Sequence, residues 1–221
     1  MNLASPLLNL IAVVMEFIGS LISFVVGYYA LKAYRTSGSK GLFTLYWGFT
    51  ILGIGVFLRA FTATYIRLIS GVYEAPRQLV GLINLVALIY SITQLVAYSF
   101  IVATYVFQAR PQSEKVAVAG SLSVAAAAVF PLYRLFYIPW LELVAITMLA
   151  FVVVSTFTNW RTKKSSESAL VFLGFVLIML CHVFFLFLVV SEMFLLIGQV
   201  TQLAGFICLS AMLAKVSRTN G

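Results

Sequence analysis

The chain has 221 residues, of which 63% are hydrophobic and only 9% are charged, and its mean hydropathy is +1.09. This composition excludes a soluble globular domain, because long apolar runs of this kind cross a hydrocarbon core about 30 Å thick. The formal net charge of +8 does not indicate nucleic-acid binding, since the basic residues fall in the short connections between apolar stretches. We therefore expect an all-α integral membrane protein that is surrounded by membrane lipid and binds no nucleic acid.

Seven apolar stretches follow one another along the chain, and each is long enough to predict a transmembrane helix. Strands are not expected, because an isolated strand cannot satisfy its backbone hydrogen bonds in lipid. The chain should form a single membrane domain over residues 1–221. In chain order the predicted spans are about 7–31, 42–65, 79–107, 116–133, 139–159, 169–190 and 193–214.

Basic residues are unequally divided between the two sides of these spans. One side has only Arg67, Arg77 and Arg134, so the positive-inside rule places the N-terminus outside and the C-terminus in the cytoplasm. No signal-peptide pattern precedes the first span and no N-glycosylation sequon occurs, which favours a multi-pass protein of a prokaryotic plasma membrane. The predicted cytoplasmic side carries the larger set, Lys32, Arg35, Lys40, Arg110, Lys115, Arg161, Lys163, Lys164, Lys215 and Arg218.

The fourth span, about 116–133, is richer in small residues than the others. Small side chains let helices approach closely. Two interpretations stay open: tight packing inside the bundle, or a surface for a homodimer or a partner protein. The residues concerned are Ala117, Ala119, Gly120, Ser121, Ser123 and the run Ala125 to Ala128.

Two parts of the chain repeat the same widely spaced residues. Residues 15–58 and 141–184 align at a constant offset of 126 and share seven identities in 44 positions. The pattern predicts three helices plus three, at about 7–110 and 139–218, joined by the fourth span as a linker. Since spans one and five run in the same direction, the halves are expected to be parallel repeats. The recurring residues include Glu16, Arg35, Thr36, Gly48 and Phe49, matched by Glu142, Arg161, Thr162, Gly174 and Phe175, and Thr93-Gln94-Leu95 matches Thr201-Gln202-Leu203.

In architecture this 3+1+3 arrangement resembles the seven-helix bundles of the sugar transporters with PQ-loop repeats and of the opsin-like receptors. Neither family's motif is present. The Pro111-Gln112 pair lies in a predicted cytoplasmic loop, and Lys215 is at the cytoplasmic end of the seventh span rather than mid-membrane, where a retinal Schiff base would form. The resemblance therefore implies a bundle, and function is argued from the site residues.

Six polar or ionisable residues, one on each of six spans, are predicted to lie at a similar depth. Counted at 1.5 Å per residue from the cytoplasmic end of each span, they fall roughly 21–28 Å up, in the outer third of the membrane. Such residues are costly in lipid, usually face the bundle interior and mark functional sites. The candidates for ligand binding or proton relay are Glu16, Arg59, Gln94, Glu142, His182 and Gln202.

Within this layer we predict two pairs, Glu16–Arg59 and Glu142–His182. The first would stay charged at physiological pH, whereas the second could titrate, because the unperturbed pKa of histidine lies near neutrality. The first pair either fixes helix packing or takes part in binding or relay. His182 is a hydrogen-bonded core residue, a proton sensor or ligand contact, or a metal ligand. Gln94 and Gln202 either join helices or contact a ligand.

The sequence offers few residues that could bind a cofactor or a metal or carry out catalysis. A single histidine cannot provide bis-histidine haem ligation or a multi-ligand zinc centre, Asp is absent, and no nucleophile or phosphate-binding motif occurs. Cys181 and Cys208 are expected as small apolar residues rather than a disulfide or metal pair. We expect no cofactor, no metal and no enzyme activity.

Three functions stay open. The first is a receptor or sensor module acting through a partner protein. The second is an accessory subunit of a membrane complex. The third is a proton-coupled small-solute transporter, which the nearly featureless inner halves of spans one, five and six disfavour, since transport needs polar residues toward the cytoplasm.

Overall fold

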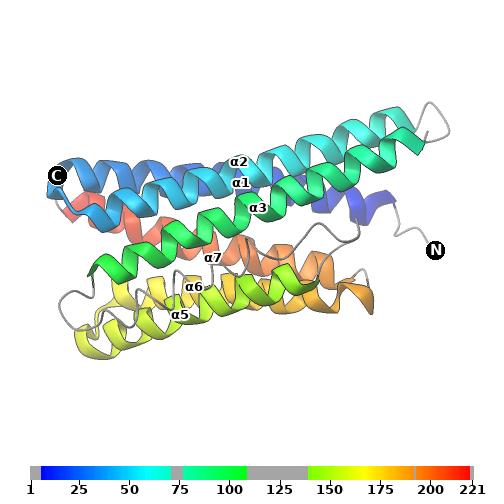
Figure 1. Cartoon of the computed structure of the whole chain (residues 1–221). Coiled ribbons are helices and arrows are strands. Elements are labelled where there is room, and N and C mark those ends of the chain that lie inside the picture. The colour runs from blue at the N-terminus through cyan, green and yellow to red at the C-terminus, as the bar shows by residue number, and fades with distance from the viewer. Residues whose placement is uncertain (1–5, 71–76, 109–138, 192, 220–221) are drawn as a thin grey trace.

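The computed structural model describes residues 6–70, 77–108, 139–191 and 193–219 (Figure 1). Over these ranges the chain is helical and contains no strand. Six of its helices are long and apolar enough to cross a membrane, so the chain is a multi-pass membrane protein. They are α1 (Pro6–Ser37), α2 (Lys40–Ser70), α3 (Arg77–Gln108), α5 (Pro139–Lys163), α6 (Ser166–Leu186) and α7 (Met193–Thr219). The predicted fourth span, 116–133, lies outside the described residues.

The predicted spans and the helices differ mainly at their ends. α1 continues to Ser37 rather than to about residue 31, because Lys and Arg are as good helix formers as Leu and continue the helix beyond the hydrocarbon core. α6 ends at Leu186, and a short 3₁₀ helix, η1 (Phe187–Val189), occupies the rest of the predicted span. An apolar run marks the membrane thickness but not the end of the helix.

Two tight turns join α1 to α2 and α5 to α6. Gly38 and Lys164 each have a positive φ, 67° and 49°, which ends the preceding helix in the left-handed region. Their N–H groups donate to the carbonyls of Tyr34 and Trp160, both at 2.8 Å. After the second turn, the Ser165 hydroxyl caps α6 by accepting the N–H of Ser168 at 3.2 Å. Each turn reverses the chain, so α1 and α2, and likewise α5 and α6, are antiparallel hairpins.

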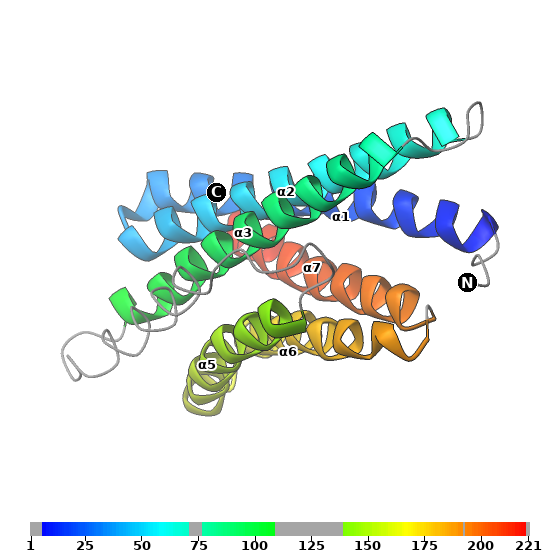
Figure 2. The same ribbon diagram turned by 45° about the vertical axis from the view of Figure 1, so that its right-hand side comes forward.

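The six helices pack side by side in a closed ring. Around the ring, α1 contacts α2, α2 contacts α3, α3 contacts α5, α5 contacts α6, α6 contacts α7, and α7 contacts α1. Figures 1 and 2 show α1, α2 and α3 grouped on one side and α5 and α6 on the other, with α7 beside α1. The ring encloses an interior that side chains from all six helices reach.

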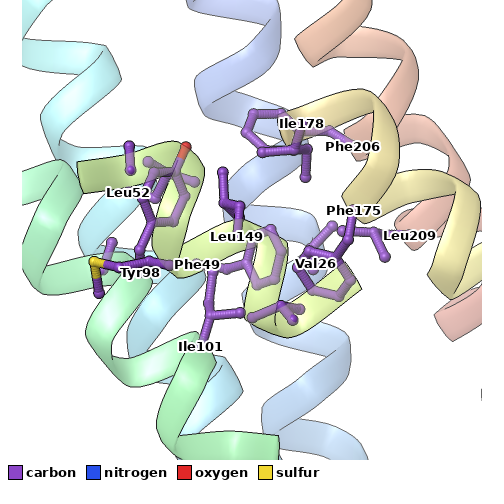
Figure 3. Close-up of a cluster of buried hydrophobic side chains, with 14 of the residues drawn as sticks. Val26, Phe49, Leu52, Tyr98, Ile101, Leu149, Phe175, Ile178, Phe206 and Leu209 are labelled. Atoms are coloured by element: carbon purple, nitrogen blue, oxygen red, sulfur yellow. The ribbon is translucent and has the colours of Figure 1, made fainter. Parts of the chain in front are cut away.

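Apolar side chains from all six described helices fill the interior of the bundle (Figure 3). Phe49, Phe175 and Phe206 are almost completely buried at the centre, and the rings of Phe49 and Phe206 meet edge to face with centroids 6.1 Å apart. Large apolar residues also cover the outer surface, among them Leu21 at 63% exposure and Val154 at 62%. An apolar exterior of this kind suits a lipid environment.

Two glycines let neighbouring helices pack closely. A Cβ on Gly48 of α2 would lie 2.8 Å from Ile101 Cγ1 and 3.1 Å from the carbonyl oxygen of Ala97 on α3. A Cβ on Gly174 of α6 would lie 2.8 Å from Leu209 Cγ on α7. These distances are too short for a side chain, so both helix pairs depend on glycine at the crossing.

Candidate functional site

The first cluster of polar residues lies where α1, α2, α3 and α7 meet. Arg59 Nη2 lies 2.9 Å from Glu16 Oε1, so the predicted ion pair Glu16–Arg59 is present. Gln199 Nε2 of α7 donates to the same Oε1 at 2.8 Å. The Arg59 guanidinium carbon stands 4.1 Å from the centroid of the Tyr90 ring, which is cation–π geometry. We call Glu16, Arg59, Tyr90 and Gln199 the arginine cluster.

The second cluster lies between α3, α5 and α6. His182 Nδ1 lies 2.5 Å from Glu142 Oε2, so the second predicted pair is present as well. On the other side of the ring, His182 Nε2 lies 2.6 Å from the Tyr98 hydroxyl and 3.1 Å from Gln94 Nε2. His182 is fully buried and Tyr98 is 1% exposed. We call Gln94, Tyr98, Glu142 and His182 the histidine cluster.

The histidine cluster can satisfy either charge state of its imidazole. In the neutral ring, Nδ1–H donates to Glu142 while Nε2 accepts the Tyr98 O–H, and the Gln94 amide donates to the Tyr98 oxygen at 3.4 Å. In the protonated ring, Nε2–H donates to Tyr98, whose O–H then needs an acceptor. A half-turn of the Gln94 amide presents its oxygen for this purpose. Gain of a proton therefore reverses the direction of hydrogen bonds on α3.

Helix α3 connects the two clusters. Tyr90, Gln94 and Tyr98 follow one another at intervals of four residues and so lie on one face of the helix. Tyr90 contacts Arg59, whereas Gln94 and Tyr98 contact His182. The polar residues thus form one layer to which all six described helices contribute.

The two clusters differ in how well their polar atoms are satisfied. Every buried polar atom of the histidine cluster has a hydrogen-bond partner. In and beside the arginine cluster, by contrast, buried atoms without a partner among the described residues are Glu16 Oε2, Arg59 Nε and Nη2, Tyr90 Oη, Gln199 Oε1 and Gln202 Nε2. Arg59 Nη2 belongs to this set because its contact with Glu16 is an ion pair by distance without hydrogen-bond geometry.

Five of the six predicted site residues take part in these two clusters. Gln202 is buried at 6% exposure, but its amide nitrogen has no partner in the described part of the chain, and Gln199 one turn earlier contacts Glu16 instead. The sequence prediction also missed Tyr90 and Tyr98. The spacing of four residues on either side of Gln94 was the available signal for both tyrosines.

Three other reactive side chains are Cys181, Cys208 and Lys215. Cys181 is buried and its thiol donates to the Ile178 carbonyl at 2.9 Å, while Cys208 is half-buried, and both thiols are free. Within the described ranges no three His, Cys, Asp or Glu side chains are grouped so as to hold a metal ion. At the end with the tight turns, Lys215 Nζ lies 2.5 Å from Glu167 Oε1 and donates to Ser166 Oγ. This contact ties α6 to α7 far from the polar layer.

Comparison with protein-family models, with curated proteins and with solved structures gives no match. The architectural resemblance to PQ-loop transporters and opsin-like receptors therefore stays an expectation from sequence. The two polar clusters are the basis for proposing a function.

Proposed function

We propose that the chain is a non-enzymatic membrane protein of receptor or sensor type, in which the polar layer responds to a proton or a small ligand and the change passes to a partner protein. The observation that carries this proposal is the position of His182. Its imidazole is fully buried, can be satisfied in both charge states, and contacts side chains from α3 and α5 while belonging to α6. A change in its charge state would alter contacts among three helices at once.

We also propose seven membrane helices with the N-terminus outside. Tyr98 and Tyr105 of α3 contact His182 and Phe175 of α6, so α3 is antiparallel to α6, as α5 is. α3 and α5 therefore run in the same direction, and the 30 residues between them must return from one end of the bundle to the other. One further crossing by the predicted span at 116–133 accounts for this return.

The proposed internal repeat is supported by matching geometry in the two halves. Gly38 and Lys164, offset by 126, share the left-handed conformation and the same backbone hydrogen bond to the residue four positions earlier. Likewise Phe43 N–H donates to the Ser39 carbonyl at 3.4 Å, and Ala169 N–H donates to that of Ser165 at 3.1 Å. The two hairpins therefore turn in the same way at corresponding residues.

The helix crossings match as well. Gly48 approaches Ala97 and Ile101 on α3, whereas Gly174 approaches Gly205 and Leu209 on α7. The offset is 126 between the glycines and 108 between both pairs of neighbours, which is the offset that relates Gln94 to Gln202. Equal offsets on two separate helix pairs favour a duplicated three-helix unit over chance resemblance of apolar sequences.

For the location we propose a prokaryotic plasma membrane, with the tight turns on the cytoplasmic side. Exposed Arg35 and Lys40 flank the first turn, and exposed Arg161, Lys163 and Lys164 flank the second. This orientation puts the polar layer toward the outside. A homodimer or partner-protein contact through the small-residue span at 116–133 belongs to the same proposal.

The alternative is a proton-coupled small-solute transporter. The unpartnered polar atoms around Arg59 favour it, because they could contact a solute. The packing of the interior favours the receptor, because Phe49, Phe175 and Phe206 fill it (Figure 3), and Phe49 lies between Arg59 and the tight turn at Gly38 along the chain. A transporter would need this apolar plug to open.

The two functions are separated by purification and flux. The protein is extracted from its native membrane in a mild detergent and its co-purifying proteins are identified by mass spectrometry. Another protein in stoichiometric amount supports the sensor and names its output. If the protein purifies as a monomer or homodimer without a partner, and proteoliposomes show proton-driven solute uptake, the transporter function is favoured and the sensor function is refuted.

A further inference from the structure

The arginine cluster contains buried polar atoms without a hydrogen-bond partner, whereas the histidine cluster contains none among the described residues. Tyr90, Gln199 and Gln202 are each at least nine-tenths buried, yet each has a polar atom without a partner among the described residues. Buried polar groups in native proteins are bonded to protein, water or ligand, because leaving them unpaired is costly. Several unpaired atoms gathered around one ion pair therefore point to a molecule bound there.

The donors define one end of this molecule. Arg59 Nε has no partner, and Nη2 is ion-paired with Glu16 but makes no hydrogen bond. Together the two nitrogens form the edge of the guanidinium that binds a carboxylate through two parallel hydrogen bonds. One face of the guanidinium is covered by the Tyr90 ring, which holds its plane. The Arg59 side chain is 23% exposed as a whole, but Nε and Nη2 are themselves buried, so a ligand reaches this edge only when the surrounding side chains move.

The acceptors define the other end. Arg59 Nη2 and Gln199 Nε2 both approach Glu16 Oε1, which leaves Oε2 of the same carboxylate unpartnered. The Gln199 carbonyl oxygen is unpartnered too. A carboxylate oxygen and an amide oxygen both accept hydrogen bonds, which suits an ammonium group, because an ammonium group only donates.

Charge completes the description. Glu16 and Arg59 together carry no net charge, so a bound anion or cation would leave an uncompensated charge inside the bundle. A molecule with one carboxylate and one ammonium group carries no net charge either. Its two groups match the two unpartnered edges of the ion pair.

We propose that the arginine cluster binds a small zwitterion of the α-amino-acid class, with its carboxylate on Arg59 Nε and Nη2 and its ammonium group on Glu16 Oε2 and Gln199 Oε1. This inference rests on the proposed function, since it names the ligand to which the polar layer responds. It assigns ligand binding to the arginine cluster and leaves proton response to the histidine cluster.

The test is equilibrium binding of ¹⁴C-labelled glycine, the smallest such zwitterion, to the purified full-length protein in lipid nanodiscs. Saturable binding is expected. Unlabelled glycine should displace the label, whereas equal concentrations of acetate or methylammonium, each carrying one of the two groups, should displace it at least about tenfold less well. Trimethylglycine, which is a zwitterion without N–H donors, should also compete poorly.

Two variants locate the site. Arg59→Lys keeps the positive charge but loses the two parallel N–H donors of the guanidinium. Gln199→Met keeps the Glu16–Arg59 ion pair but loses the amide oxygen that accepts from the ammonium group. Each variant should weaken glycine binding about tenfold or more. Arg35→Lys, on an exposed cytoplasmic arginine, is the matched control and should bind as the parent protein does. Absence of saturable binding, equal displacement by acetate, or unchanged binding in both site variants would overturn the proposal and leave water as the occupant.

The outcomes also separate this inference from the proposed function. Glycine binding without any partner protein would support the ligand site and contradict the proposed sensor function. A pH response that depends on His182, together with no glycine binding, would retain the sensor and remove the zwitterion site.

Discussion

Two buried tyrosines on α3 offer a direct test of the hydrogen-bond assignment in the polar layer. Tyr98 and Tyr90 are 1% and 6% exposed and lie eight residues apart on one helix. The Tyr98 hydroxyl lies 2.6 Å from His182 Nε2, whereas the Tyr90 hydroxyl has no partner in the described ranges. Replacement of each by Phe removes one oxygen atom and keeps the ring. Only the replacement of Tyr98 should therefore lower the stability of the protein.

The expected size follows from what Tyr98→Phe leaves behind. An unsatisfied buried group costs about 1–3 kcal/mol, and hydrogen bonds between membrane helices measure about 0.6–1.7 kcal/mol. Gln94 Nε2, 3.1 Å from His182 Nε2, can donate in place of the lost hydroxyl and reduces the loss. We expect Tyr98→Phe to lower the free energy of unfolding by about 1–1.5 kcal/mol, whereas Tyr90→Phe removes an unpaired buried hydroxyl and should leave the free energy of unfolding unchanged or raise it.

The assay is reversible unfolding by SDS in mixed dodecylmaltoside micelles, followed by tryptophan fluorescence. No ligand is added, so that the Tyr90 hydroxyl stays unpaired. Equal effects of the two substitutions, or a neutral Tyr98→Phe, would show that the contact between Tyr98 and His182 does not stabilise the fold.

Three further outcomes are expected. Tryptophan fluorescence or the unfolding temperature of the parent protein should change between about pH 5 and 8, and His182→Gln should flatten that profile, whereas an unchanged profile would disprove titration of this histidine. Gly174→Ala should lower the free energy of unfolding by about 1–3 kcal/mol in the SDS assay, because its Cβ would meet Leu209 at 2.8 Å. Gly19→Ala is the control, since its Cβ would stand 3.9 Å from Phe206, and a similar loss there would argue against a close crossing at Gly174. Lys215→Met should leave the free energy of unfolding nearly unchanged, because its ion pair with Glu167 is largely exposed, and a clear loss would mean that this contact holds α6 against α7.

The two ion pairs could be predicted from the sequence because charged residues are rare in the spans. An acid and a cation at similar depth in a membrane bundle have few alternative partners, and helical rise gives the depth directly. Glu16–Arg59 and Glu142–His182 were therefore predictable as pairs. Which neighbouring helices each pair would contact could not be predicted, because the depth of a residue does not give the direction in which its side chain points around the helix axis.

That missing direction explains the residues that were not predicted. Gln202 was chosen by its match to Gln94, yet Gln199 faces Glu16, and a single turn of α7 separates the two. Tyr98 was not distinguished from the many tyrosines that suit the membrane interface. The early end of α6 was missed for a related reason, because neither Gly nor Pro marks the boundary at Leu186.

The arrangement of the glutamines bears on how the protein is made. Gln94 of α3 contacts His182, which is paired with Glu142 between α5 and α6. Gln199 of α7 donates to Glu16, which is paired with Arg59 between α1 and α2. During synthesis Glu16 and Arg59 enter the membrane long before α7 leaves the ribosome. Glu16 therefore lacks the amide donor Gln199 until α7 has been inserted. Insertion of α7 thus completes the hydrogen bonding of an early part of the bundle, and a chain interrupted before α7 would leave the Glu16 carboxylate without its amide donor.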